Sequence, residues 1–121
     1  MAMVVPASFN ITIVKGADFS FAFDIDVNGT IMNLTGATVK AEIRMADKKA
    51  STLIDEFTAA ISEGAETGYD SDITLSLTDA ETLAITAPEG YYDVLVTSAG
   101  GEDGYYLRGK ITFQDSVTEK P

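Results

Sequence analysis

The chain has 121 residues and a formal net charge of −11, with 19 acidic against 8 basic side chains. It contains no cysteine and no histidine, which excludes disulfides, thiolate metal sites, cysteine nucleophiles and the commonest general base. A surface this acidic repels phosphate groups, so we expect neither nucleic acid nor a membrane surface as a partner.

The first part of the chain alternates between apolar and polar residues, which is typical of half-buried strands. This alternation predicts a strand over residues 8–14 and a longer one from Phe19 to Val27. A helix would scatter the aromatic rings of the second run around its circumference. Asn28-Gly29 follows and is a strong hairpin signal, because both residues tolerate positive φ. A short return strand through Ile31 would complete the hairpin.

The middle of the chain contains one clear strand and one ambiguous segment. Residues 39–45 alternate and predict a strand. In residues 53–61, Leu53, Phe57 and Ile61 would share one helix face at a spacing of four, yet they also fit an alternating strand. The β-branched residues of this segment and its strand-like neighbours favour a strand.

The second half contains three further strands and one helix signal. Strands are predicted over residues 73–77, 92–96 and 105–113. Between the first two, Thr78 and Glu81 have the spacing of a capping box, which predicts one short helical turn near Asp79–Leu83.

These elements predict an all-β fold, a sandwich or barrel of seven or eight antiparallel strands. A jelly roll or a small barrel remains an alternative. Parallel βαβ units are excluded because no long helical segment separates the strands. We expect a single domain, residues 1–121, with its core at residues 8–114 and flexible tails at 1–7 and 115–121.

Acidic residues are the main candidates for chemistry, and none forms a recognisable site. Asp24 and Asp26 lie opposite the aromatic face of their strand, so we expect them to point into water and to form no catalytic pair. Glu66, Asp70 and Asp72 follow one another in a glycine-containing loop, but the spacing of a calcium loop is missing. We therefore expect no catalytic residue, no cofactor and no metal, and we expect that the protein is not an enzyme.

Two tyrosine pairs are candidates for an interface. Alternation sends one ring of each pair inward, which predicts that Tyr91 and Tyr106 point outward while Tyr105 joins Leu107 in the core. Exposed tyrosines are favoured in protein interfaces. The alternative is cross-strand packing on the outer face of the sheet.

Arg44 and Asp93 are candidates for a structural salt bridge. Both lie on the polar side of their strands, and the third and penultimate strands are often neighbours in an immunoglobulin-like sandwich.

Lys48-Lys49 is too short to form a nucleic-acid patch.

Several segments follow one another in a recognisable order: "FNITIVKGADFSFAF" from Phe9, "NLTGATVKAEIR" from Asn33, "ITLSLTDAET" from Ile73, "GYYDVLV" from Gly90 and "LRGKITF" from Leu107. In this order the chain resembles a group of small bacteriophage and prophage virion proteins. The proteins of that group are similar to the immunoglobulin-like N-terminal domain of phage upper baseplate proteins. These motifs are turns and strands, so the similarity lies in their order and spacing.

This resemblance implies an immunoglobulin-like β-sandwich that is a structural component of a phage particle, in a tail, baseplate or fibre-attachment region, acting through protein–protein contacts. It implies other phage structural proteins as partners, multiple copies in a symmetric assembly, and a location in the virion after assembly in the host bacterial cytoplasm. The alternatives are a capsid decoration (cement) protein and a free carbohydrate- or cell-surface-binding module.

Overall fold

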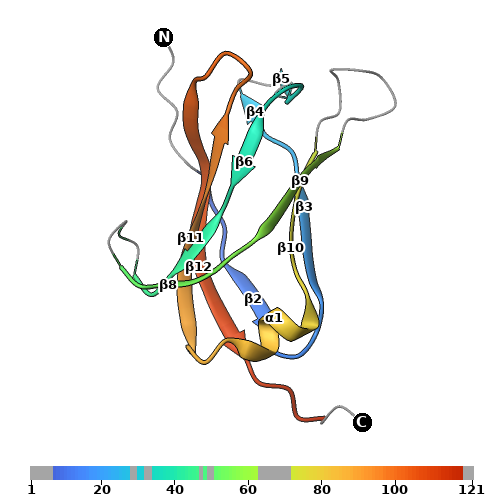
Figure 1. Cartoon of the computed structure of the whole chain (residues 1–121), viewed down its shortest axis with the longest axis vertical. Coiled ribbons are helices and arrows are strands. Elements are labelled where there is room, and N and C mark those ends of the chain that lie inside the picture. The colour runs from blue at the N-terminus through green and yellow to red at the C-terminus, as the bar shows by residue number, and fades with distance from the viewer. Residues whose placement is uncertain are drawn as a thin grey trace.

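The computed structural model describes residues 7–27, 30–31, 34–46, 48, 51–62 and 72–118. Within these residues the chain forms two packed β-sheets, a small two-stranded ribbon and one helix (Figure 1). The larger sheet contains β1 (Ala7–Ser8), β2 (Ile11–Val14), β6 (Thr38–Lys40), β7 (Glu42–Arg44), β8 (Leu53–Glu56), β11 (Glu89–Thr97) and β12 (Asp103–Gln114). The smaller sheet contains β3 (Phe19–Phe23), β9 (Thr58–Ser62) and β10 (Asp72–Leu77).

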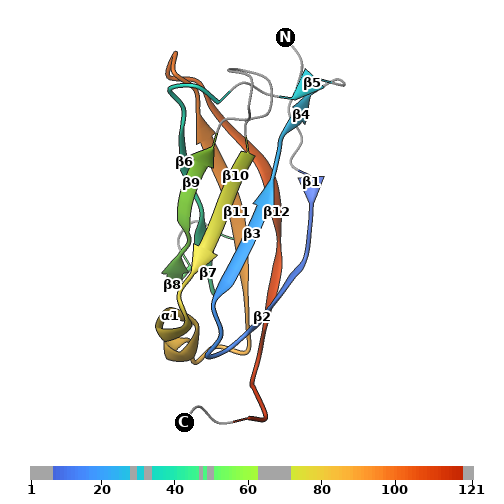
Figure 2. The same cartoon turned by 90° about the vertical axis from the view of Figure 1, so that its right-hand side faces the viewer.

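The strand order is that of an immunoglobulin-like β-sandwich, which confirms the predicted fold class. Across the larger sheet, β1 and β2 lie beside β12, which is followed by β11, by β6 and β7, and then by β8. The smaller sheet has the order β3-β10-β9, and Figure 2 shows it packed in front of the larger one. Some strands that follow one another in sequence, such as β2 and β3, therefore lie in different sheets, whereas others, such as β11 and β12, are neighbours in one sheet.

One detail of the predicted topology is wrong, because the strands are not all antiparallel. Both β1 and β2 run parallel to β12, with Ala7 opposite Leu107 and Ile11 opposite Ile111. The reason is the crossing between sheets. The chain leaves β2 through a turn at Gly16, which has a φ of 85°, and enters the other sheet instead of folding back as a hairpin.

The ambiguous segment 53–61 is extended, as predicted, but it forms two strands in two sheets. Its first half, β8, pairs with β7, and its second half, β9, pairs with β10. The switch occurs at Phe57, whose ring is buried and whose backbone N–H donates to the Ala41 carbonyl at 2.9 Å. Figure 1 shows the green ribbon of this segment crossing from one layer to the other.

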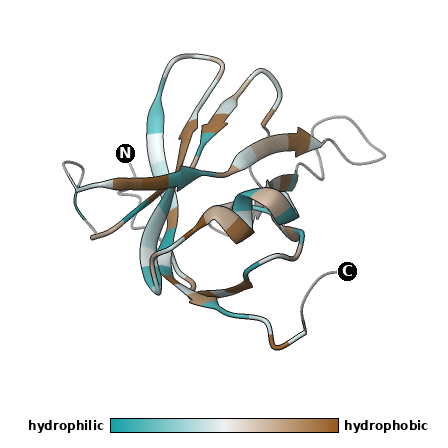
Figure 3. Cartoon of the chain, turned by 60° about the horizontal axis from the view of Figure 1, so that its bottom comes forward, coloured by the Kyte–Doolittle hydropathy of each residue, from teal (hydrophilic) through white to brown (hydrophobic). Residues whose placement is uncertain are grey.

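The core fills the space between the two sheets with the inward residues of the alternating strands. Figure 3 shows apolar and polar residues following one another along single ribbons. The buried apolar side chains include Ile11, Ile13, Leu34, Ile43, Phe57, Ile73, Leu75, Leu77, Tyr92, Val94, Val96, Ile111 and Phe113. Burial of these groups is the main stabilising contribution to such a domain.

The predicted helical turn is present as α1 (Asp79–Ala84), which lies across one end of the sandwich (Figure 3). Thr78 and Glu81 form the capping box in both directions. The helix is attached to the β2–β3 turn through the buried Thr82, whose hydroxyl accepts from the Gly16 N–H at 3.0 Å and donates to the Ala17 carbonyl at 2.9 Å.

The predicted hairpin is confirmed by strands β4 (Asp26–Val27) and β5 (Thr30–Ile31). Val27 lies opposite Thr30 in an antiparallel pair, which leaves Asn28-Gly29 as the connecting residues. The conformation of these two residues lies outside the described part of the chain. The same is true of residues 1–6 and 119–121 of the expected tails.

Candidate binding surface

The outer face of the larger sheet, on the side opposite the core, carries a groove of about 810 Å³. We call it the outer groove. Its floor is the central strand β11, and its two walls are β12 on one side and β6–β7 on the other. The residues that define it are Lys40, Glu42, Arg44, Lys48, Tyr91, Asp93, Leu95, Tyr105, Arg108 and Lys110.

The strand register arranges the side chains of the outer groove in rows across the sheet. In one row Leu95 lies between Lys40 and Tyr105. Two residues along β11, Asp93 lies opposite Arg108. After two more residues comes the third row.

In the third row Tyr91 lies between Arg44 and Lys110. Every row therefore carries a basic side chain, and the first and third rows also carry aromatic or aliphatic groups.

The charge of the outer groove is opposite to that of the rest of the protein. Five of the eight Lys and Arg residues of the chain line it, together with the carboxylates of Glu42 and Asp93, which gives the lining a formal charge of +3. The other residues of the chain therefore sum to a formal charge of −14, which together with the +3 of the lining gives the net charge of −11. Such a separation of charge favours an approach of acidic groups to this face.

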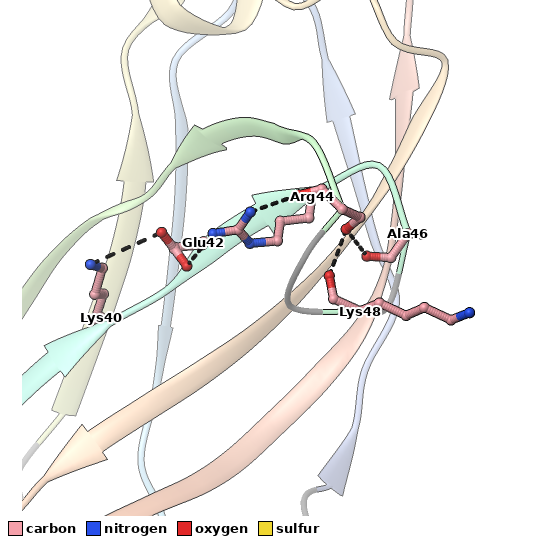
Figure 4. A network of polar contacts seen from close by, with 6 residues as sticks. Lys40, Glu42, Arg44, Ala46 and Lys48 are labelled. Carbon is pink, nitrogen blue, oxygen red and sulfur yellow. Dashed lines mark hydrogen bonds and ion pairs between the residues drawn. The ribbon is translucent and has the colours of Figure 1, made fainter.

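The β6–β7 wall is held by a network of polar contacts (Figure 4). The Arg44 guanidinium lies 3.1 Å from the Glu42 carboxylate and donates to the Ser51 carbonyl at 2.7 Å. The Lys40 ammonium lies 4.0 Å from the same carboxylate. The Ser51 hydroxyl lies 2.9 Å from the Ala46 carbonyl and 2.6 Å from that of Lys48, so Arg44 is fixed against the loop that follows β7.

The predicted Arg44–Asp93 salt bridge stays a prediction, although the strands that carry the two residues are neighbours, as expected. The register places Arg44 opposite Tyr91 and Asp93 opposite Arg108. Glu42 is two residues before Arg44 on the same face of the same strand, and its carboxylate contacts the Arg44 guanidinium.

On the β12 wall, Lys110 is the groove residue nearest the C-terminus. The Lys110 ammonium lies 2.8 Å from the Glu89 carboxylate, and this hydrogen-bonded ion pair raises the pKa of Lys110. The backbone N–H of Lys110 donates to the Asn10 side-chain oxygen at 3.0 Å. The ammonium group is thus positively charged across the physiological pH range and is held beside Tyr91.

The two candidate tyrosines lie on different sides of the sheet. Tyr91 is half-buried in the outer groove. Tyr106 packs against the core, while Tyr105 is exposed at 37% and lines the groove, so the predicted orientations of these two are reversed.

The cause of this reversal is a β-bulge. Val94 pairs with Leu107 and the next residue, Leu95, pairs with Tyr105, so Tyr106 is the extra residue and the alternation changes phase. The ring of Tyr106 lies over Gly104, where a Cβ would come within 2.6 Å of it.

Behind the groove, Tyr92 fastens the N-terminal strands to the sheet. Its hydroxyl donates to the Phe9 carbonyl at 2.7 Å, and burial raises its pKa to about 12. The Tyr92 ring packs against Gly109. A Cβ at Gly109 would collide with the Phe9 carbonyl oxygen and would lie 3.1 Å from the ring, so this close approach requires a glycine. The edge of the groove formed by Ser8 and Asn10 is therefore held in a fixed position.

The described residues contain no group of three or more acidic, histidine or cysteine side chains placed to bind a metal ion. Asp24 is exposed. The side chain of Asp26, and the whole of Glu66 and Asp70, lie outside the described part of the chain. No helix in that part is both long and apolar enough to cross a bilayer. The arrangement at the outer groove is suited to non-covalent binding through charge, hydrogen bonds and aromatic contact.

Comparison with known proteins identifies no family for this chain. No protein-family model matches the chain, and no curated protein matches it. Among solved structures, the chain is similar to the sialic acid binding region of a Streptococcus sanguinis SK1 adhesin bound to 3'sLn, with a TM-score of 0.49 and 12% sequence identity. The match covers 89% of this chain and 28% of that structure.

Proposed function

We propose that the protein is a structural component of a bacteriophage particle, in a tail, baseplate or fibre-attachment region, and that it is attached through protein–protein contacts at the outer groove. Two independent observations support the proposal. The sequence segments between Phe9 and Phe113 resemble those of phage virion proteins in their order and spacing, and the chain folds as the sandwich that this resemblance implies. The outer groove supplies a surface for attachment.

The observation that carries the proposal is the composition of the outer groove. Tyr and Arg are enriched among the residues that contribute most to protein interfaces, and here Tyr91 and Arg44 lie side by side in one row. The groove is built on strands, not on loops, and its β6–β7 wall is fixed by the contacts of Glu42 and Ser51. A surface whose side chains are already ordered loses less conformational entropy on binding.

Two alternatives use the same surface. A capsid decoration protein would bind through similar contacts and would differ only in its location in the particle. A carbohydrate-binding module is favoured by one observation, that Tyr91 and Tyr105 both line the groove beside basic side chains. In that case the tyrosine rings would stack on sugar rings and the groove would bind a free glycan.

The proposal is tested on phage particles from a host in which the gene is expressed. Heads and tails are separated and the protein is sought in each by mass spectrometry. We expect it in tails, whereas its presence in heads would favour the decoration protein. Absence from both fractions, together with binding of purified protein to a glycan array, would refute the proposal and favour the carbohydrate-binding module.

A further inference from the structure

We propose that the outer groove binds an extended acidic segment of another protein, with Asp or Glu at alternate positions, lying along β11. The inference deepens the proposed function and rests on it, because it names the chemistry of the partner at the same surface. It is carried by the spacing of the basic side chains, by the charge of the remaining surface and by the acidic residues that already contact three of the cations.

The spacing of the cations matches the repeat of an extended chain. Along β12, Arg108 and Lys110 are two residues apart on the same face, and two residues of a strand span about 7 Å. On the other wall Lys40 and Arg44 are four residues apart, about 13–14 Å. An extended partner segment places every second side chain on the same side with the same repeat of about 7 Å. Carboxylates at alternate positions of the partner therefore meet the cations of successive rows.

The distribution of the cations favours a peptide segment over a single sugar acid. A lone carboxylate is best bound by donors that converge on one point. Here the basic groups lie on both walls, beside a floor that runs from Tyr91 to Leu95 and spans about 13 Å. Tyr91 and Leu95 on the floor provide apolar contact for the partner's side chains between its acidic positions.

The rest of the surface directs an acidic partner to this face. With +3 on the groove lining and −14 elsewhere, an acidic segment is attracted by the outer groove and repelled by the remaining surface. Repulsion outside the intended surface is one way in which binding specificity arises.

Two carboxylates of the protein, Glu42 and Glu89, already form ion pairs with cations of the outer groove. Glu42 contacts Arg44 and Lys40, and Glu89 contacts Lys110 at 2.8 Å. They hold the cations in place when the groove is empty and compete with the partner's carboxylates. Removing the charge of Glu89 therefore leaves Lys110 available to the partner and strengthens binding.

The first experiment measures binding of a fluorescent peptide of alternating Glu and Thr, about eight residues long so that it exceeds the ~13 Å floor. Fluorescence anisotropy is recorded with the full-length protein at low and at physiological salt. One control peptide has the same composition with all Glu residues contiguous, and another has Lys in place of Glu. We expect binding of the alternating peptide, weaker binding of the contiguous one, none of the basic one, and a decrease as salt is raised.

The second experiment uses variants of matched charge. Arg44→Gln and Lys110→Gln are expected to weaken peptide binding by about three- to tenfold each, as for interfacial ion pairs of moderate exposure. Lys15→Gln changes the net charge equally but alters a residue that contacts Asp115 outside the groove, and it should leave binding unchanged. Glu89→Gln is expected to strengthen binding. A thermal melt of each variant confirms that it is folded.

The inference is overturned if the alternating peptide does not bind at low salt, or if the contiguous peptide binds equally well. It is also overturned if Lys15→Gln weakens binding as much as the groove variants, or if a uronic-acid oligosaccharide binds more tightly than the peptide. A mass in solution that rises with concentration, and that falls in the groove variants, would assign the groove to a second copy of the chain.

The particle experiment separates this inference from the proposed function. If the protein is present in tails and the Arg44→Gln and Lys110→Gln variants are incorporated normally, the inference fails together with attachment at the outer groove, and the role as a tail component stands. If the peptide binds as expected but the protein is absent from particles, the proposed function fails and the chemistry of the groove stands.

Discussion

Replacing Tyr92 by Phe tests how the N-terminal strands are attached to the sheet. The change removes one hydroxyl and leaves the ring in place, so the packing of Tyr92 against Phe57, with ring centroids 6.0 Å apart, is kept. What is lost is the 2.7 Å hydrogen bond to the Phe9 carbonyl. A buried hydrogen bond contributes about 0.5–1.5 kcal/mol, and an acceptor left without a partner raises the cost. We expect a decrease of about 1–2 kcal/mol in the free energy of unfolding.

The pH dependence of this difference gives a second readout. The folded pKa of Tyr92 is about 12 and its ordinary value is 10.0, so the protonated form is favoured in the folded state. The resulting stabilisation is fully present below pH 10, the unfolded pKa, and is lost as the pH rises through the folded pKa. With allowance for solvent screening, it amounts to about 1–2 kcal/mol. The wild type therefore loses stability between pH 10 and pH 12 that Tyr92→Phe does not lose.

The assay is urea unfolding of wild type, Tyr92→Phe and Tyr91→Phe at several pH values from 8 to about 11.5. Tyr91 is the matched control, because it precedes Tyr92 on the same strand and lies on the outer face. We expect Tyr92→Phe to be less stable than the wild type at pH 8 and the gap to close at high pH. Equal stability at pH 8, or a gap that is the same at every pH, would refute the reasoning.

Three further predictions concern single contacts and metal. Gly109→Ala places a Cβ against the Phe9 carbonyl oxygen and should lower the free energy of unfolding, measured in urea, by about 3 kcal/mol or more. The control Gly100→Ala, whose new Cβ has its nearest atom at 3.9 Å, should lower it by less than about 1 kcal/mol. Similar losses in the two variants would contradict this account. Thr82→Val leaves the Gly16 N–H without its acceptor and should cost about 1–3 kcal/mol, against a near-zero change for the exposed Thr112→Val, and a silent Thr82 variant would argue against the attachment of α1. EDTA should leave the melting temperature unchanged, and a fall of several degrees would reveal a stabilising metal ion.

The strands and the helix were predictable from the sequence because their signals are local. Alternation identifies a buried face without knowledge of the partner strand, and the Thr78–Glu81 capping box predicts where α1 begins. The hairpin of β4 and β5 follows from Asn28-Gly29 in the same way. In each case the residues that determine the element lie within a few positions of one another.

The features that local patterns do not contain are the bulge and the sheet crossing. The change of phase at Tyr106 arises from the register between β11 and β12, so alternation within residues 105–113 gave the wrong orientation for Tyr105 and Tyr106. The switch at Phe57 depends on the neighbouring Ala41 carbonyl. Both are set by pairing between distant segments.

The outer groove was missed because its cations come from separate parts of the chain. Lys40 and Arg44 are more than sixty residues from Arg108 and Lys110, and the pairing of β11 with both walls brings them together. One signal was present in the sequence. Arg44, Arg108 and Lys110 all occupy polar positions of alternating strands, so a prediction of strand order would have placed them on one face.

The central claim is that the outer groove is covered in the assembled particle. Lysine acetylation followed by mass spectrometry measures it directly, in the purified protein and in intact tails. Lys40 and Lys110 have exposed side-chain fractions of 58% and 43% in the isolated chain, against 16% for Lys15 outside the groove. We predict that Lys40 and Lys110 become protected in tails while the reactivity of Lys15 does not change. Equal reactivity of Lys40 and Lys110 in both samples would contradict the account.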